Sequence, residues 1–255
     1  MIPVLMYHAL ADAAHPSGLD DPAEELYTLT TEAFATQLAW LSDQGFSTLL
    51  FADILAGMPV PDRAVILTFD DGHASNHTLA LPLLRRFGMR AEFFITTNRI
   101  DWPNYLQEWQ IAELAAAGMG IGSHGASHAY LSDLDDSALV GELRQAKERL
   151  QKIVNAGINS YSAPGGRLST RVMTTATRLG YRLHCSSAVA LWQTSESVVP
   201  RTAIKKGTPL TEFQKIARGG SRYYLWARAR YLILKIVKTA LGNRLYAALH
   251  RRLAA

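Results

Sequence analysis

Short apolar runs alternate with amphipathic segments along most of this chain. The runs that predict strands lie at 2–7, 46–50, 64–69, 91–95, 118–122, 181–186 and 197–204, with a further strand near Ser160. Between them, apolar residues recur at helical spacing, and the predicted helices cover 34–45, 79–88, 108–117, 132–155 and 169–179. Strand and helix alternate about seven times, which favours a closed parallel α/β barrel over an open sheet.

Composition is consistent with one large domain. The chain has 255 residues, of which 48% are hydrophobic, enough for one large core. Its single cysteine, Cys185, excludes an intramolecular disulfide and gives no sign of an oxidising compartment. Residues 1–8 lack the basic start and the cleavage site of a signal peptide, so we expect a strand there and a cytoplasmic location.

The net charge of +4 is distributed unevenly. Residues 213–255 contain ten Lys or Arg and no Asp or Glu, which leaves 16 basic and 22 acidic residues in the rest of the chain. An acidic body argues against nucleic acid as a partner. We therefore expect a main domain at 1–207 and a basic helical tail at 208–255.

The tail is amphipathic between Arg222 and Ala240. Leu225, Leu232 and Ile236 share one helical face, and the opposite face carries lysine and arginine. No apolar run approaches the ~20 residues of a transmembrane helix. The tail is therefore either an outer helix packed on the barrel or an interfacial anchor that binds an anionic membrane surface.

One predicted strand, 64–69, ends in Asp70, Asp71 and Gly72. Adjacent residues on a strand point to opposite faces, so we expect the two carboxylates to have different roles. Parallel α/β folds place their chemistry at the carboxyl ends of the strands. An isolated Asp-Asp-Gly is also typical of a turn that caps the next helix, so this stretch alone does not identify a site.

A second strand end carries two histidines. His124 and His128 follow the strand-like segment 118–122. Two imidazoles four residues apart can meet one cation, and with one carboxylate they form a common set of divalent-metal ligands. Because the chain already carries Asp-Asp at another strand end, a metal site is favoured over two hydrogen-bonded loop histidines.

Three segments together resemble the motifs of the NodB-homology polysaccharide deacetylases, carbohydrate esterase family four. Thr68–Gly72 is similar to the first motif, His124–His128 to the second and Tyr161–Gly166 to the third, in the order and spacing of the family. The resemblance covers residues 1–205 approximately and implies a distorted (β/α)7 barrel. The segment Met6-Tyr7-His8 resembles the permuted branch of the family, which deacetylates poly-N-acetylglucosamine.

The resemblance implies a role for each residue of the first two motifs. Asp71, His124 and His128 match the metal ligands of the family, and Asp70 matches its general base. Zn²⁺ is the default ion for two imidazoles and a carboxylate, with Co²⁺, Ni²⁺, Mn²⁺ or Fe²⁺ as alternatives.

The general acid is less clearly marked. Most of the family uses a histidine in a Leu-His pair late in the domain, and no such pair follows the strand 181–186 within the expected domain, residues 1–207. By resemblance to the permuted branch, we expect His8 to be the acid, with His184 and His73 as alternatives.

The third motif departs from the family pattern. Ser162 replaces the arginine that holds the base aspartate, and Arg167 is the nearest basic residue that could substitute for it. Pro164 fixes the loop, and the N–H of Gly165 would stabilise the tetrahedral oxyanion.

Two aromatic residues, Trp102 and Tyr105, lie in the irregular segment 97–105. They could stack on sugar rings or hold this loop on the barrel. A further irregular segment, 11–30, is expected to form a surface loop near the mouth of the site.

From the resemblance we expect a metal-dependent hydrolase that removes acetyl groups from N-acetylated sugars of a polysaccharide or a lipid-linked glycan, as in exopolysaccharide biosynthesis. Two alternatives remain: a catalytically degenerate glycan-binding protein of the same fold, and an esterase that releases O-acetyl groups. If the tail is an anchor, the enzyme would work at the inner face of the membrane.

Overall fold

The computed structural model describes residues 1–18, 22–220 and 222–225. The strands are β1 (Val4–Tyr7), β2 (Leu10–Ala11), β3 (Leu29–Thr30), β4 (Ser47–Thr48), β5 (Ala64–Phe69), β6 (Glu92–Ile95), β7 (Gly120–Ser123), β8 (Ser160–Ser162), β9 (Leu183–Cys185), β10 (Val198–Val199) and β11 (Thr202–Ala203). The helices are α1 (Pro22–Glu25), α2 (Thr31–Asp43), α3 (Phe51–Leu55), α4 (Leu81–Arg86), α5 (Glu108–Ala116), α6 (Asp136–Val154), α7 (Thr170–Arg178) and α8 (Leu210–Ala217).

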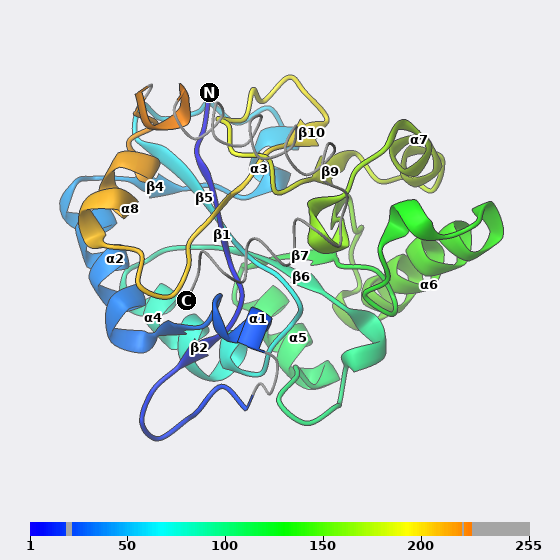
Figure 1. Cartoon of the computed structure of the whole chain (residues 1–255), viewed down its shortest axis with the longest axis horizontal. Helices are drawn as coiled ribbons and strands as arrows, with labels where there is room; N and C mark the ends of the chain where they lie inside the picture. The colour runs from blue at the N-terminus through cyan, green and yellow to red at the C-terminus, as the bar shows by residue number, and fades with distance from the viewer. Residues whose placement is uncertain (19–21, 221, 226–255) are drawn as a thin grey trace, which may run out of the picture.

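The main sheet consists of parallel pairs. Its order is β10-β9-β8-β7-β6-β5-β1-β11, with β4 also paired to β5. The strands β2 and β3 pair with each other outside it. Figure 1 shows the helices around the outside of this sheet, with α2 beside α8 and α6 beside α7.

The sheet curls around an apolar interior. Val4 of β1 and Ile66 of β5 lie on neighbouring strands, and Val199 of β10 lies at the far end of the sheet, yet all three belong to one buried cluster. Alternate residues of the same strands, such as Leu5 and Leu67, face a second cluster beneath the helices. This arrangement confirms the predicted parallel α/β fold of the distorted-barrel type.

Two predicted strands are shorter than the sequence pattern indicated. The segment 46–50 contains only β4, and the segment 197–204 is divided into β10 and β11 by Pro200 and Arg201. Proline has no backbone N–H for the ladder, and the side chain of Arg201 turns into the barrel, as described below. The segment 11–30 is also less irregular than expected, since it contains α1, β3 and the last residue of β2.

The first part of the predicted tail packs on the body of the protein. Phe213 of α8 is fully buried, and its ring contacts Trp40 of α2 edge-on at 5.9 Å. Residues 226–255 lie outside the described residues, so the amphipathic helix and the domain boundary after residue 207 stay predictions. Within the described part of the chain, no helix combines the length and apolarity needed to cross a membrane.

The three motif segments meet at one edge of the sheet. Asp70 follows β5, His124 follows β7, and Ser162 is the last residue of β8. These strands are parallel and lie within the run β8-β7-β6-β5 of the sheet order, so their carboxyl ends lie at the same edge. The topology therefore brings together residues that are far apart in the sequence.

Candidate active site

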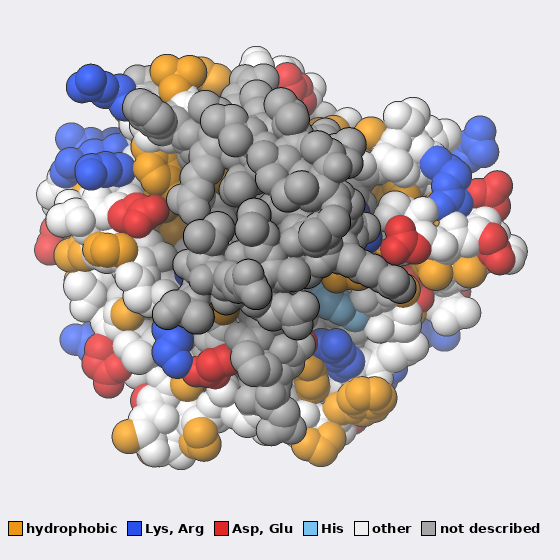
Figure 2. Space-filling view, viewed as in Figure 1, with side chains coloured by type: hydrophobic (Ala, Val, Ile, Leu, Met, Phe, Trp, Pro, Cys, Tyr) orange, Lys and Arg blue, Asp and Glu red, His pale blue; other side chains and the backbone are white. Residues whose placement is uncertain are grey.

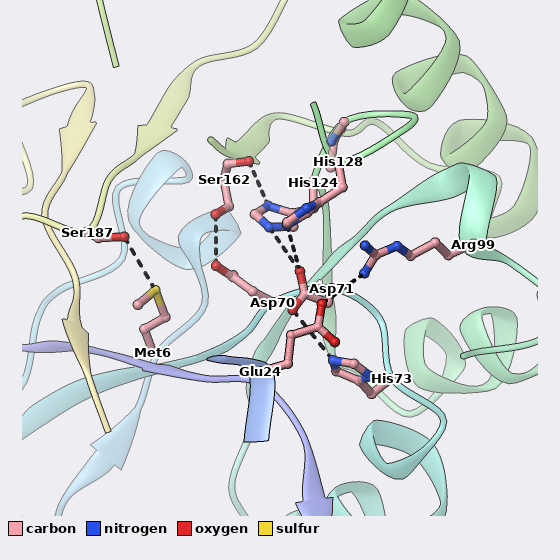
Figure 3. A network of polar contacts seen from close by, with 12 residues as sticks. Met6, Glu24, Asp70, Asp71, His73, Arg99, His124, His128, Ser162 and Ser187 are labelled. Carbon is pink, nitrogen blue, oxygen red and sulfur yellow. Dashed lines mark hydrogen bonds and ion pairs between the residues drawn. The ribbon is translucent and has the colours of Figure 1, made fainter. Parts of the chain in front are cut away.

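Asp70 and Asp71 leave β5 in different directions. Figure 3 shows Asp70 pointing toward Ser162 and Asp71 pointing toward the histidines. Asp71 has a φ of 74°, and His128 has a φ of 67°. Such backbone angles are uncommon outside glycine and cluster at functional sites, where the surrounding structure must compensate for the strain. The two adjacent carboxylates thus lie in separate environments.

Asp71, His124 and His128 converge on one point. Oδ1 of Asp71 lies 3.2 Å from Nε2 of His124 and 3.2 Å from Nε2 of His128. The Nδ1–H of His124 donates to the carbonyl oxygen of Ser162 over 2.8 Å. This bond fixes the tautomer and leaves the lone pair of Nε2 facing Asp71.

The charges of this group suit a divalent cation. Burial alone would raise the pKa of Asp71, but the imidazoles of His124, His128 and His73 outweigh burial and hold this pKa well below its usual value. Oδ1 of Asp71 is buried and accepts no hydrogen bond from the described residues, which is costly unless a cation lies at this point. A carboxylate oxygen and two imidazole nitrogens are ligands that Zn²⁺ takes. The residues present therefore fit a metal ion.

Asp70 belongs to a second, buried network. Its Oδ1 accepts a hydrogen bond from Nη1 of Arg201 at 2.6 Å, and its Oδ2 accepts one from Nη2 at 2.7 Å. The hydroxyl of Ser162 accepts from Nη2 of Arg201 at 2.6 Å and donates to Oδ2 of Asp70 at 3.1 Å. Burial raises the pKa of Asp70, but Arg201 and His124 lower this pKa by a larger amount, so the carboxyl group is ionised at neutral pH.

Arg201 makes the contact with Asp70 that the sequence analysis considered for Arg167. Arg167 lies elsewhere, with its guanidinium 4.0 Å from the ring centre of Tyr130 and 3.5 Å from Asp133. The sequence did contain a signal for Arg201. A charged residue inside an apolar strand pattern is costly to bury, so it indicates a buried partner of opposite charge.

His8 lies close to both aspartates. It follows β1, its backbone carbonyl accepts from the side chain of Asn76 at 2.8 Å, and its ring packs against Tyr27 at 4.6 Å. Burial lowers the pKa of His8, and attraction to Asp71 and Asp70 offsets only part of this effect. Nδ1 is buried without a hydrogen-bond partner among the described residues. The structure thus places a neutral imidazole with a free nitrogen near the carboxylates.

The two alternative histidines differ in position. Nε2 of His184 lies 3.3 Å from the hydroxyl of Thr177 on α7, away from the aspartates. His73 lies beside the candidate metal group, with Nε2 3.5 Å from Oδ2 of Asp71. The ring of Tyr105 stacks on His73 at 5.0 Å, and its hydroxyl accepts from Arg99 at 2.8 Å. Tyr105 therefore holds the inner part of its loop in place, as one of the two interpretations expected.

The loop with Pro164 and Gly165 borders the same edge. Gly165 has a φ of 64°, and a Cβ there would lie 2.7 Å from the ring of Tyr130, so glycine suits this position. Trp102 is 58% exposed, so its indole is accessible to a ligand. In the space-filling view, histidine side chains reach the surface beside basic and hydrophobic side chains (Figure 2). The side chain of His128 is 29% exposed, whereas that of Asp71 is nearly buried, so the candidate metal ligands reach the surface at His128.

Comparison with known proteins gives the same family by sequence. The family model described as polysaccharide deacetylase matches residues 57–184. YxkH of Bacillus subtilis, which carries the name of a polysaccharide deacetylase, is 27% identical over 186 residues, covering 71% of this chain and 63% of YxkH. The poly-beta-1,6-N-acetyl-D-glucosamine N-deacetylase of Escherichia coli is 34% identical over 89 residues, covering 33% of this chain and 13% of that enzyme.

A solved structure supports the fold. The deacetylase PplD of Streptococcus pyogenes, in complex with acetate, superposes with a TM-score of 0.74 at 22% identity, covering 85% of this chain and 97% of PplD. The chain spans less than two thirds of the length of the two curated relatives, so their whole activities do not transfer directly. The family model covers half of the chain and includes all three motif segments. The chain therefore belongs to the polysaccharide deacetylase family.

Proposed function

We propose that this protein is a metal-dependent hydrolase that removes acetyl groups from N-acetylated sugars. The observation that carries the proposal is the convergence of Asp71, His124 and His128 beside a separately held carboxylate, Asp70. Asp71, His124 and His128 fit a cation, and Asp70 fits a general base. Hydrolysis of an unactivated amide requires both.

Different residues of the chain would carry out different steps of the reaction. Asp71, His124 and His128 would hold a divalent ion, which would supply Lewis-acid polarisation of the acetyl carbonyl and lower the pKa of a water molecule. Asp70 accepts the proton of the attacking water, and Arg201 keeps Asp70 ionised and oriented for this step.

Two further groups would act later in the reaction. The N–H of Gly165 donates to the oxyanion that forms from the carbonyl oxygen. His8 would deliver a proton to the nitrogen of the departing sugar amine. Burial lowers the pKa of His8, and attraction to Asp71 and Asp70 offsets part of this effect, so the two carboxylates help the imidazole to hold the proton that this step needs. The products are acetate and a free amino sugar.

The substrate class is proposed from the chemistry of the site and from the E. coli relative, whose name specifies poly-N-acetylglucosamine. We favour an N-acetylglucosamine polymer or a lipid-linked glycan, with Trp102 as a platform for a sugar ring. The location that matches this substrate is the cytoplasm, with the protein bound to the inner face of the membrane through the basic tail, residues 208–255. Sedimentation of the full chain with anionic and neutral vesicles tests this location, and equal binding to both would reject it.

The test of function is acetate release from N-acetylglucosamine oligomers by the full chain, before and after removal of metal with a chelator. Release that stops on metal removal and returns with Zn²⁺ is the expected result. Absence of release with every divalent ion would favour the degenerate glycan-binding protein. Release from O-acetylated sugars alone would favour the esterase.

A further inference from the structure

His73 is a buried side chain whose polar atoms make no hydrogen bond with the described residues. It is only 2% exposed, and neither Nδ1 nor Nε2 has a partner. Leaving a buried polar group without a hydrogen bond costs free energy. A buried histidine in this state, directly beside a candidate metal ligand, therefore calls for an explanation.

The two carboxylate oxygens of Asp71 face different imidazoles. Oδ1 lies between His124 and His128, at 3.2 Å from each Nε2. Oδ2 points the other way, and its neighbour is Nε2 of His73 at 3.5 Å. Figure 3 shows His73 on the opposite side of Asp71 from the other two histidines. His73 thus faces Oδ2 of Asp71, the oxygen that does not lie between His124 and His128.

Packing holds the ring of His73 in this position. Tyr105 stacks on it with an interplanar angle of 26°, and the two residues form an isolated β-bridge. Arg99 donates to the hydroxyl of Tyr105 and lies 3.9 Å from Glu24 of α1. The backbone N–H of Leu106 donates to the carbonyl of Gly72 at 2.9 Å, which ties this loop to the end of β5. The imidazole of His73 is therefore held in place by residues other than Asp71, His124 and His128.

We propose that His73 is a positioning residue that orients Asp71 for metal binding. Nε2–H of His73 donates to Oδ2, so that Oδ1 is the oxygen presented between His124 and His128. Groups that hydrogen-bond to a ligating carboxylate fix its orientation, and their loss typically weakens metal binding 10- to 100-fold. This inference rests on the metal dependence proposed above.

The test is the dissociation constant of Zn²⁺, measured by competition with a chromophoric chelator, for the full chain and three variants. His73→Phe keeps a ring against Tyr105 but removes the donor, and we expect ~10- to 100-fold weaker binding. His73→Gln keeps an N–H donor at a similar distance from the backbone and should bind Zn²⁺ within about threefold of the unchanged chain. His77→Phe, which removes a histidine that contacts Glu113 outside the site, should leave binding unchanged.

The outcomes separate this inference from the proposed function. If the unchanged chain binds no Zn²⁺, the proposed metal site itself fails. If it binds Zn²⁺ and His73→Phe binds equally well, only the role of His73 fails. A loss in His73→Gln as large as that in His73→Phe would contradict positioning and indicate that the imidazole is itself a ligand. Should His73→Phe not fold, His73→Asn, whose amide is too short to reach Oδ2, is expected to show the same loss.

Metal affinity also separates positioning from acid catalysis. A histidine that protonates the leaving group would lower kcat without changing the dissociation constant of Zn²⁺. For His73→Phe, we expect kcat on an N-acetylglucosamine oligomer to recover to within about threefold at saturating Zn²⁺. A kcat that stays more than about a hundredfold low at full occupancy would overturn the positioning role.

Discussion

The guanidinium of Arg201 donates to both carboxylate oxygens of Asp70, at 2.6 and 2.7 Å, across 131 positions of sequence. Both side chains are almost completely buried. A bidentate arginine fixes the plane of a carboxylate as well as its charge. Asp70 can therefore serve as a base of defined direction, although the arginine of the third motif is absent.

We predict that Arg201→Met strongly lowers turnover at neutral pH. Without Arg201, burial dominates and raises the pKa of Asp70, so the acid limb of kcat/KM should move to higher pH. The loss should approach the ~10²-fold typical of a misplaced general base. Breaking a buried pair can also cost about 3–5 kcal/mol of stability, so Arg201→Lys, which keeps the charge, serves as a second variant with a smaller loss.

Arg167→Met is the matched control for this prediction. Arg167 contacts Tyr130 and Asp133 at the surface, so its removal should leave the acid limb in place. An unmoved acid limb in both Arg201 variants, or an equal shift in Arg167→Met, would show that Arg201 does not control the ionisation of Asp70.

The second prediction concerns His8. His8→Ala should lower turnover on an N-acetyl sugar by ~10²- to 10⁴-fold, because the amine leaves only when protonated. An activated acetyl ester, whose leaving group needs little protonation, should be affected far less. Parallel steady-state assays on the two substrates measure this difference.

His184→Ala is the control for His8. His184 contacts Thr177 of α7, so its removal should leave the ratio of amide to ester turnover unchanged. A loss in His8→Ala below about threefold on the amide would assign the acid to another group.

The geometry of parallel strands explains which parts of this site could be predicted from the sequence. Asp70 and His124 each follow directly after a strand, Asp71 is the next residue after Asp70, and the carboxyl ends of parallel strands share one edge. Their proximity could therefore be predicted from apolar runs and the order of the motifs. His128 could be predicted from its spacing to His124 together with the family resemblance.

The contact of Arg201 with Asp70 and the burial of His73 could not be predicted from the sequence, for different reasons. Arg201 reaches Asp70 through a break between two very short strands, and no periodic pattern indicates which distant residue a buried arginine will contact. His73 follows a glycine at a strand end, where exposed turn residues are common, and its burial depends on stacking by Tyr105 from a separate loop. Both outcomes are decided by tertiary contacts.

Glu92 is a buried acid that takes no part in the proposed chemistry. It lies at the start of β6, and its Oε1 accepts a hydrogen bond from the N–H of Phe51 at 2.6 Å. A Cβ at Gly120 would lie 2.2 Å from its Oε2, so the neighbouring strand leaves just enough room for the carboxyl group. Burial raises the pKa of Glu92 to about 7, while Asp53 and Arg90 nearby have opposing effects.

The third prediction is a pH-dependent gain in stability for Glu92→Gln. The folded protein holds the proton of Glu92 up to about pH 7, whereas the unfolded chain releases it near the ordinary pKa of 4.5. The free energy of unfolding therefore falls as pH rises between these values, by about 3 kcal/mol for this group. Glutamine keeps an oxygen for the N–H of Phe51 and does not titrate.

Urea unfolding of the unchanged chain and of Glu92→Gln, from pH 4.5 to pH 8, measures this effect. The advantage of Glu92→Gln should grow through this range and level off above about pH 7. A difference between the two proteins that does not vary with pH would show that Glu92 titrates normally in the folded state.

The central claim is that the adjacent aspartates have separate functions, with Asp71 holding a metal ion and Asp70 accepting a proton. The most direct measurement is the metal content of purified Asp70→Asn and Asp71→Asn, together with their acetate release from an N-acetylglucosamine oligomer. Asp70→Asn should keep the metal content of the unchanged chain and lose turnover, since asparagine keeps the shape but not the basicity. Asp71→Asn should lose both metal and turnover. Equal metal contents in the two variants, or metal loss in Asp70→Asn alone, would contradict the account.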